Sequence, residues 1–170
     1  MKKYISAIFS VSIFFLVFTG LNFTEQPKQN EAGQPETSVY ELISMTDQLS
    51  IFHELVETAG MSDKLNEESP ITAFLPVNNA FNNLPDGLLD SYKEDEEALQ
   101  ELLNHHIVAA EVASRDLEDG EELEMMSGGT ALIAITDMGL ELNNANIIQV
   151  DVDASNGLIH VVNEVILPEE

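Results

Sequence analysis

The spacing of hydrophobic and polar positions divides the chain into a helical half and a strand-rich half. A first helical stretch begins after Ser38, and Glu41 follows that serine by three residues, as in a capping box. A second stretch over 52–59 places apolar residues at positions i, i+3, i+4 and i+7, and Gly60 suits its C-terminal cap. These patterns predict two amphipathic helices at the start of the folded region.

The helical pattern continues after a short apolar segment. Asn78 or Asn79 can cap a short helix that stops before the next proline, and residues 88–92 form another helical turn. The clearest helix is predicted over 94–104, because acidic residues occupy its first turn and suit the positive end of the helix dipole. Leucines of this segment share one stripe with His106.

Strands are predicted before and after these helices. Residues 70–76 form a β-branched and aromatic run between prolines, which indicates a buried strand. After residue 106 the period changes to two, and the short apolar segments are 123–126, 130–136, 140–142, 147–153 and 158–167. Asn156-Gly157 is the strongest hairpin signal and predicts that its flanking strands pair antiparallel. The whole pattern predicts an α+β domain.

Residues 1–24 have the pattern of an export segment. Two lysines precede an apolar run over 4–21, which is typical of a signal peptide and about long enough for an uncleaved N-terminal anchor. We therefore expect a signal peptide or anchor over 1–24, a flexible linker over 25–37 and a folded domain over 38–168. This domain is expected to be exported to the periplasm, the cell surface or the medium.

Acidic residues dominate the charge of the chain. It holds 31 acidic and 6 basic residues, with a formal net charge of −25. Such a surface repels phosphate backbones, which argues against nucleic-acid binding, and it favours a soluble monomer. The acidity suits either a saline habitat or an ordinary acidic secreted protein. The chain has no cysteine, so disulfides and thiolate ligands are excluded and stability depends on core packing.

Three sequence blocks resemble the fasciclin domain family and extend over nearly all of residues 38–168. The first, TAFLPVNNAFNNLP at 72–85, is similar to the family's TVFAPTNxAFxxLP segment. The second, LLNHHIV at 102–108, is similar to LLxYHVV, and the third, ASNGLIHVVNEVILP at 154–168, is similar to ATNGVIHVIDxVLLP. Their shared order and spacing make the resemblance specific.

The resemblance implies a β-wedge of two small sheets with flanking N-terminal helices. It also implies an extracellular domain of adhesion, matrix or cell-surface binding without enzymatic activity or a cofactor. We therefore expect a binding module of a bacterial exported protein, whose partner is a cell-surface protein or a glycan. The alternative is a small-ligand binding protein or an enzyme that uses a pocket between the wedge and the helices.

The family motifs single out Asn78, His105, His106 and His160 as a candidate binding surface. Two positions depart from the family pattern. Val77 stands where the family usually has threonine, and His105 stands where it usually has tyrosine. The Tyr-His region of animal members is tied to integrin binding, so the second departure argues against integrin recognition by this chain.

The same histidines also have a structural interpretation. His106 lies on an apolar helical stripe and His160 in an apolar strand, so we expect both to be partly buried and bonded to backbone or to Asn78. If His106 is buried and neutral, acid should destabilise the domain. A zinc site would need several histidines to converge with carboxylates, and a helix would splay His105 and His106 apart. His53 is predicted to lie on the surface.

Other chemical motifs are weak. Residues 151–157 are faintly similar to a calcium loop, but glycine falls at the seventh place and Val162 occupies the twelfth, where the loop needs glutamate. A hairpin turn explains this segment better. The chain has no Gly-x-Ser-x-Gly motif and no phosphate-binding glycine loop, and its acidic runs are explained as solvated faces. We expect no catalytic residue, metal or cofactor.

Overall fold

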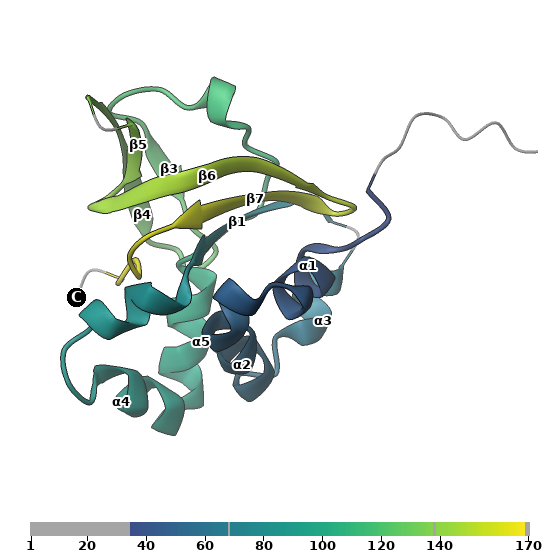
Figure 1. The fold of residues 1–170 in the computed structure, drawn as a ribbon, viewed down its shortest axis with the longest axis vertical. Coiled ribbons are helices and arrows are strands. Elements are labelled where there is room, and N and C mark those ends of the chain that lie inside the picture. Colours follow the sequence, from purple (N-terminus) through teal and green to yellow (C-terminus); the bar gives the residue numbers. More distant parts are fainter. Residues whose placement is uncertain (1–34, 68, 138, 169–170) are drawn as a thin grey trace, which may run out of the picture. The chain divides into compact units, whose positions relative to one another are not determined.

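Helices and strands occupy different halves of the chain, as the sequence pattern predicts. The computed structural model describes residues 35–67, 69–137 and 139–168. The helices gather on one side of the strands, apart from the short helical turn at 114–116 on the opposite side, and the strands form a wedge (Figure 1). Because all but one of the strands follow residue 106, the predicted α+β class is confirmed.

The helical elements of the described residues are short. In chain order they are α1 (Val39–Met45), η1 (Asp47–Leu49), α2 (Ser50–Thr58), α3 (Ser62–Asn66), η2 (Asn78–Asn83), α4 (Leu88–Glu94), α5 (Glu96–Asn104) and η3 (Ser114–Asp116), where η marks a 3₁₀ helix. The predicted capping box of α1 is confirmed. The Ser38 hydroxyl accepts the Glu41 N–H at 3.1 Å, and the Ser38 N–H donates to the Glu41 carboxylate at 3.0 Å.

Two helical features differ from the sequence prediction. The helix predicted over 94–104 is interrupted at Asp95, where α4 ends and α5 begins. The Asp95 carboxylate accepts the N–H groups of Glu97 and Ala98, each at 3.1 Å, and so caps α5. The five-residue helix α3 is not predicted, because Leu65 is its one apolar residue and a single position shows no period.

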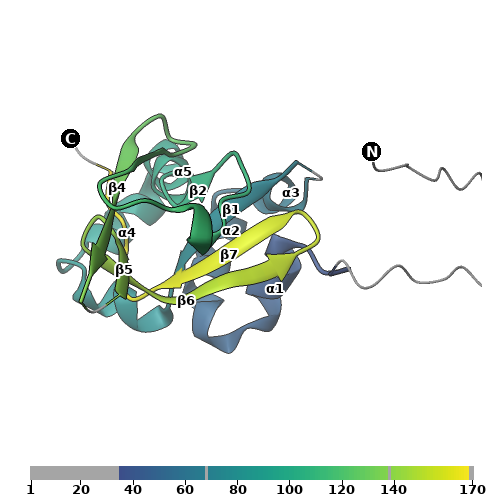
Figure 2. The same ribbon diagram turned by 90° about the horizontal axis from the view of Figure 1, so that it is seen from above.

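The strands form one continuous order that bends into a wedge. They are β1 (Ile71–Pro76), β2 (Ile107–Val108), β3 (Glu122–Glu124), β4 (Thr130–Thr136), β5 (Gly139–Leu142), β6 (Ala145–Ala154) and β7 (Gly157–Val162). Their order is β2-β1-β7-β6-β5-β4-β3. β6 pairs with β5 on one side and with β7 on the other, so the two sheets expected of the wedge, which we call its arms, share β6. β1 runs parallel to β7, and the remaining pairs are antiparallel. Figure 2 shows β4 and β5 near one end of the β6–β7 hairpin and α1 near the other.

β1 and β7 lie between two hydrophobic cores. Ala73 and Leu75 of β1 belong to the core that faces the helices, whereas Phe74 belongs with Val162 to the core between the two arms of the wedge. Side chains alternate along a strand, so β1 supplies both cores. This explains why every residue of β1 is buried, as its apolar run predicts.

The Asn156-Gly157 turn joins β6 to β7 in the predicted antiparallel pairing. Gly157 has a φ of +148°, and a Cβ added there would lie 1.8 Å from the first carbonyl oxygen of β1, so this position requires glycine. The buried Asn156 side chain accepts the Val39 N–H at 2.9 Å and donates to the carbonyls of Leu65 and Glu67 at 2.8 and 2.9 Å. The turn therefore also ties the sheet to α1 and α3.

The N-terminal expectations fall mainly outside the described residues. The signal peptide or anchor over 1–24 and most of the linker over 25–37 belong to this part of the chain. Within the residues that the structure describes, no helix combines the length and the apolar character that crossing a membrane requires.

Candidate functional site

His106 lies just after α5 inside the hydrophobic core, with 1% of its surface exposed. The Ile166 N–H donates to its Nε2 at 3.0 Å, so the neutral ring carries its proton on Nδ1 and donates it to the Leu102 carbonyl at 2.8 Å. The Phe52 ring meets the imidazole edge-on, with centroids 5.8 Å apart. His106 therefore links α5 to the C-terminal segment, residues 163–168, and does not form surface.

Burial lowers the pKa of His106 from 6.5 to about 4. The main cause is desolvation, which disfavours the charged ring, while the bond to the Leu102 carbonyl acts in the opposite direction. Neighbouring His105 lowers the pKa further. The ring is therefore neutral at pH 7, in agreement with its acceptor role toward Ile166.

His160 lies in β7 and is fully buried beside Phe74, with ring centroids 5.1 Å apart. The Asp151 N–H donates to its Nδ1 at 3.2 Å, and its Nε2 donates to the Val112 carbonyl at 2.9 Å. Asp151 sits in an irregular part of β6 with a φ of +53°. Its carboxylate accepts the hydroxyl and the N–H of Ser114, and the hydroxyl bond is the main cause that lowers the pKa of Asp151. His160 thus joins β7, β6 and the loop before η3.

His105, which follows α5 directly, is also buried, with 1% of its surface exposed. Its Nδ1 lies 2.8 Å from the hydroxyl of Ser127, and that hydroxyl also accepts the Gly129 N–H at 3.3 Å. A Cβ added to Gly129 would lie 3.0 Å from the His105 ring. The turn between β3 and β4 therefore covers the position at which the family usually has tyrosine.

Neither Asn78 nor Asn79 caps η2, contrary to the sequence prediction, because the N-cap position is Val77 and η2 has no side-chain cap. The Asn78 Oδ1 accepts the Ile51 N–H at 3.0 Å, and its Nδ2 donates to the Asp47 carbonyl at 2.9 Å and to the Ser50 hydroxyl at 3.0 Å. The residue that precedes α2 is Leu49, whose side chain cannot accept a hydrogen bond. Asn78 therefore caps α2 from a distant part of the chain.

The four candidate residues do not form a shared surface. Both ring nitrogens of His106 and of His160 bond to backbone groups and not to Asn78, and Nδ1 of His105 lies beside the Ser127 hydroxyl. No three or more His, Asp or Glu side chains of residues 35–67, 69–137 and 139–168 are grouped to hold a metal ion. His53, which the sequence places on the surface, is half-buried, and its Nε2 lies 3.4 Å from the Tyr40 hydroxyl.

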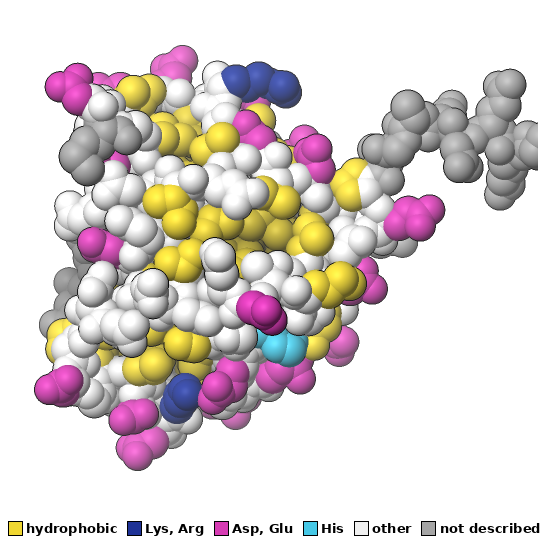
Figure 3. Space-filling model, in the orientation of Figure 1, with side chains coloured by type: hydrophobic (Ala, Val, Ile, Leu, Met, Phe, Trp, Pro, Cys, Tyr) yellow, Lys and Arg dark blue, Asp and Glu magenta, His cyan; other side chains and the backbone are white. Residues whose placement is uncertain are grey.

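Two of the exposed side chains of β6 are branched aliphatics, and the other exposed residues of the strand are Gln149, Asp151 and Asp153. Ile148 is 57% exposed and Val150 is 39% exposed, and we call this pair the β6 strip. Figure 3 shows hydrophobic side chains gathered near the middle of one face, where β6 and β7 pass in Figure 1, with acidic side chains mostly around the margin. Exposed apolar patches of this kind mark interaction sites in soluble proteins. Neither residue belongs to the three motif blocks.

A hollow of about 460 Å³ lies beside Ile148. Its walls come from segments that are far apart in sequence: Asp47 and Gln48 of η1, Val77, Asn78 and Asn79 around the start of η2, and Ile148 of β6. Since the Asn78 side chain is bonded to η1 and α2, it holds this wall in place. Asn78, a residue of the first motif block, therefore contributes to this surface by holding the backbone of η1 and α2 in position.

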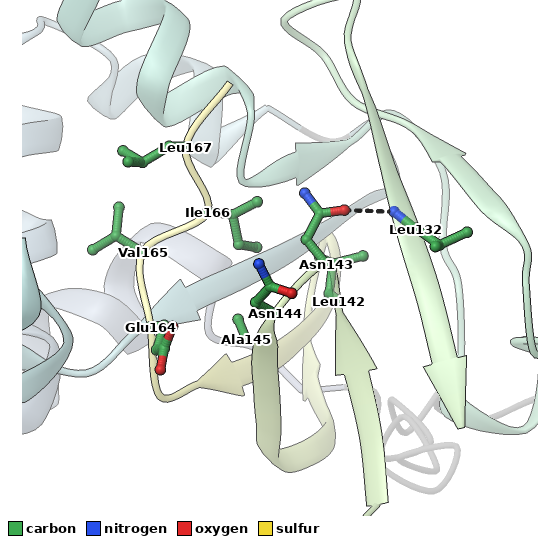
Figure 4. A pocket seen from close by; sticks show the side chains of 9 residues that line it. All are labelled: Leu132, Leu142, Asn143, Asn144, Ala145, Glu164, Val165, Ile166 and Leu167. Atoms are coloured by element: carbon green, nitrogen blue, oxygen red, sulfur yellow. Dashed lines mark hydrogen bonds between the residues drawn. The ribbon is translucent and has the colours of Figure 1, made fainter. Parts of the chain in front are cut away.

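Another hollow, of about 490 Å³, lies between the β5–β6 turn and the C-terminal segment (Figure 4). The lining residues are Leu132, Leu142, Asn143, Asn144, Ala145, Glu164, Val165, Ile166 and Leu167. The Asn143 side-chain oxygen accepts the Leu132 N–H at 2.8 Å and so serves strand pairing. Glu164 is the one ionisable residue of this described lining, which therefore lacks an acid–base pair.

A smaller hollow, of about 360 Å³, lies at the border between the helices and the sheet. Its lining is Lys64, Leu65, Glu67, Ser69, Pro70, Ile71, Ile107, Ala109 and Met126. The Lys64 ammonium donates to the Asn104 side-chain oxygen at 2.7 Å. This is the place at which a small ligand could lie between wedge and helices.

Comparison with known proteins agrees with this fold and these motifs. The family model of the fasciclin domain matches residues 47–168. Protein sll1483 of Synechocystis sp. is 32% identical over 133 residues, which cover 77% of this chain and 73% of the relative. The cell surface glycolipoprotein MPB83 of Mycobacterium bovis is 28% identical over 120 residues, which cover 65% of this chain and 54% of the relative.

A solved structure has a similar fold. It is a FAS1 domain pair from the insect cell adhesion molecule fasciclin I, with a TM-score of 0.63 and 19% sequence identity. The match covers 78% of this chain and 51% of that chain, and at this identity it shows the fold alone. With the family match and the relative that is 32% identical, the chain belongs to the fasciclin domain family.

Proposed function

We propose that the chain is an extracellular or cell-surface binding module of the adhesion type that acts without a catalytic centre. The proposal rests on the contrast between its buried polar residues and its exposed apolar ones. His105, His106 and His160 are buried, whereas Ile148 and Val150 are open to a partner. Imidazoles held inside the core are poorly placed for acid–base chemistry on a substrate, and an exposed apolar patch favours docking.

The relatives support the same function. MPB83 is a cell surface glycolipoprotein, and fasciclin I is an insect cell adhesion molecule. The export pattern of residues 1–24 agrees with action outside the cell. For an adhesion module the partner is a cell-surface protein or a glycan. Nucleic acid is a poor partner, because a net charge of −25 repels its phosphates.

The test measures binding of the purified full-length chain to whole cells and to cell-envelope preparations, at about 10 mM and about 1 M salt. We expect retention that saturates with concentration. Protease treatment of the envelopes removes protein partners and periodate destroys glycans, so each treatment tests one class of partner. An unrelated protein of similar negative charge is the control. Equal retention of that control, or no retention of the chain on any surface, contradicts the proposal.

The hollow between helices and sheet supports a second candidate function, the binding of a small apolar ligand. Its lining includes Leu65, Ile71, Ile107 and Met126, and largely apolar concave sites are typical of small-molecule binding. A ligand bound there would raise the midpoint of thermal unfolding without being required for retention on cell envelopes. The thermal unfolding assay therefore tests ligand binding, and the retention assay tests adhesion independently of it.

A further inference from the structure

β6 changes its neighbouring strand along its length. β5 pairs with it at Ala145 and Asn146, and from Ile147 onward the described ladder continues with β7 alone. An open edge that carries aliphatic side chains is a template for another strand. However, the register shifts between Ile147 and Gln149 and again between Gln149 and Val152, and such bulges interrupt a regular ladder. The β6 strip is thus suited to recognition through its side chains.

The chemistry of the strip favours a protein partner over a glycan. Ile148 and Val150 have branched aliphatic side chains, and the hollow beside Ile148 is lined by Val77 and by short polar residues. Sugar rings stack on flat aromatic faces, which these side chains do not offer. Apolar side chains of a protein gain from covering such a strip, because both surfaces leave water.

The charge of the molecule further restricts the chemical class of the partner. A net charge of −25 on each chain opposes the approach of a second copy and of anionic membrane surfaces. Asp47 lines the hollow beside Ile148, and acidic side chains lie mostly along the margin of the face that carries the hydrophobic patch (Figure 3). This surface is complementary to cationic side chains placed around an apolar centre.

We propose that the β6 strip and the hollow beside Ile148 bind a cationic apolar segment of a protein partner. Apolar side chains of that segment cover Ile148 and Val150 and enter the hollow. Its Lys or Arg side chains face Asp47 and the acidic margin. The inference rests on the proposed adhesion function, for which it names the surface and the chemical class of partner.

The test measures binding of the full-length chain to immobilised model peptides of Lys and Leu, of Lys and Ser, and of Glu and Leu. We expect binding to the Lys/Leu peptide, and the double variant Ile148→Asn/Val150→Asn should weaken it at least about tenfold. Asp47→Asn should weaken it about twofold at low salt and have no effect at about 1 M salt, where the charge is screened.

The matched control is the double variant Leu132→Asn/Ile135→Asn on β4. These residues are 46% and 55% exposed, so the substitutions are equal in kind but lie on another strand. We expect binding within about twofold of the original chain, with unfolding midpoints that verify the fold of every variant. Unchanged binding by the β6 variant, an equal loss in the β4 variant, or equal binding of the Lys/Ser or Glu/Leu peptide overturns the inference.

Retention on cell envelopes is also measured for the β6 variant, Ile148→Asn/Val150→Asn. If the original chain and the β6 variant are retained equally, the adhesion function stands and the β6 inference is overturned. If periodate alone abolishes retention, the partner is a glycan and the inference is overturned as well. If the original chain is retained on no surface, the adhesion function fails, while the peptide measurements still decide whether the strip binds a cationic apolar segment.

Discussion

The imidazole of His106 meets two backbone groups of opposite kind, the Leu102 carbonyl and the Ile166 N–H. A neutral imidazole has one donor and one acceptor on opposite sides of its ring, so it can bridge such groups inside a core. A second proton would face the Ile166 N–H and would place a charge among apolar side chains. His160 bridges the Asp151 N–H and the Val112 carbonyl in the same manner.

We predict that the domain loses stability as the pH falls below 6.5, the ordinary pKa of histidine. Between 6.5 and about 4, the unfolded chain binds a proton at His106 that the folded domain excludes. The contribution of His106 to the free energy of unfolding should therefore fall by about 1.4 kcal/mol per pH unit, and by roughly 3 kcal/mol over the whole interval. Urea unfolding at several pH values across this interval measures the slope.

The variant His106→Gln supplies the control for this slope. It removes the titrating group, so it should be less stable than the original chain at neutral pH but lose less stability in acid. Asp151, whose pKa is lowered, contributes stability that is lost at still lower pH. An unchanged slope in His106→Gln contradicts the prediction.

At the scale of elements, the fold depends on side chains that hold neighbouring segments from outside. α2 follows directly on η1, and Asn78 accepts the Ile51 N–H near the start of α2 while it donates to the Asp47 carbonyl. Asn156 has a similar function between the β6–β7 turn and the helices. Both asparagines lie in motif blocks that carry the family resemblance, and their bonds give a structural reason for these residue types.

We predict that Asn78→Ala lowers the free energy of unfolding by about 1 to 2 kcal/mol, because α2 loses its cap and polar groups of η1 and α2 lose a partner. Asn79→Ala is the matched control, because the side chain of Asn79 is exposed. This substitution should change the free energy of unfolding by less than about 0.5 kcal/mol. Urea unfolding of both variants at neutral pH measures the difference. Equal effects of the two substitutions contradict the capping role of Asn78.

At the scale of the whole molecule, negative charge is the dominant electrostatic feature. The chain carries 31 acidic and 6 basic residues. Among the described residues, ion pairs join Lys93 to Glu54 at 2.8 Å and Arg115 to Asp116 at 3.6 Å. Most acidic side chains therefore face like charges across solvent, and this repulsion opposes the compact state.

We predict that salt stabilises the domain. The screening length falls from about 30 Å at 10 mM salt to about 3 Å at 1 M, so repulsion between exposed carboxylates should weaken. The midpoint of thermal unfolding should rise between these two conditions. Repeating the measurement with a neutral osmolyte separates screening from general solvent effects. A midpoint that is unchanged or lower in 1 M sodium chloride contradicts the prediction.

Much of the fold could be predicted from local signals. The capping box at Ser38, the buried run that becomes β1 and the Asn156-Gly157 hairpin each record a local physical requirement. The motif blocks also identified the family, which the comparisons confirm. The parallel pairing of β1 with β7 could not be predicted from periodicity, because the two strands are distant in sequence and period-two patterns do not specify a neighbour.

The sequence by itself determined the element types, the family and the acidic charge, because these depend on local spacing and composition. Tertiary structure alone decided which motif residues are accessible. In β6, the alternation of Ile148, Val150 and Val152 with polar residues indicates one inward-facing side, yet the first two are exposed while Val152 packs against the helix-side core. An apolar face is buried only where another layer covers it, and that extent follows from the packing of distant segments.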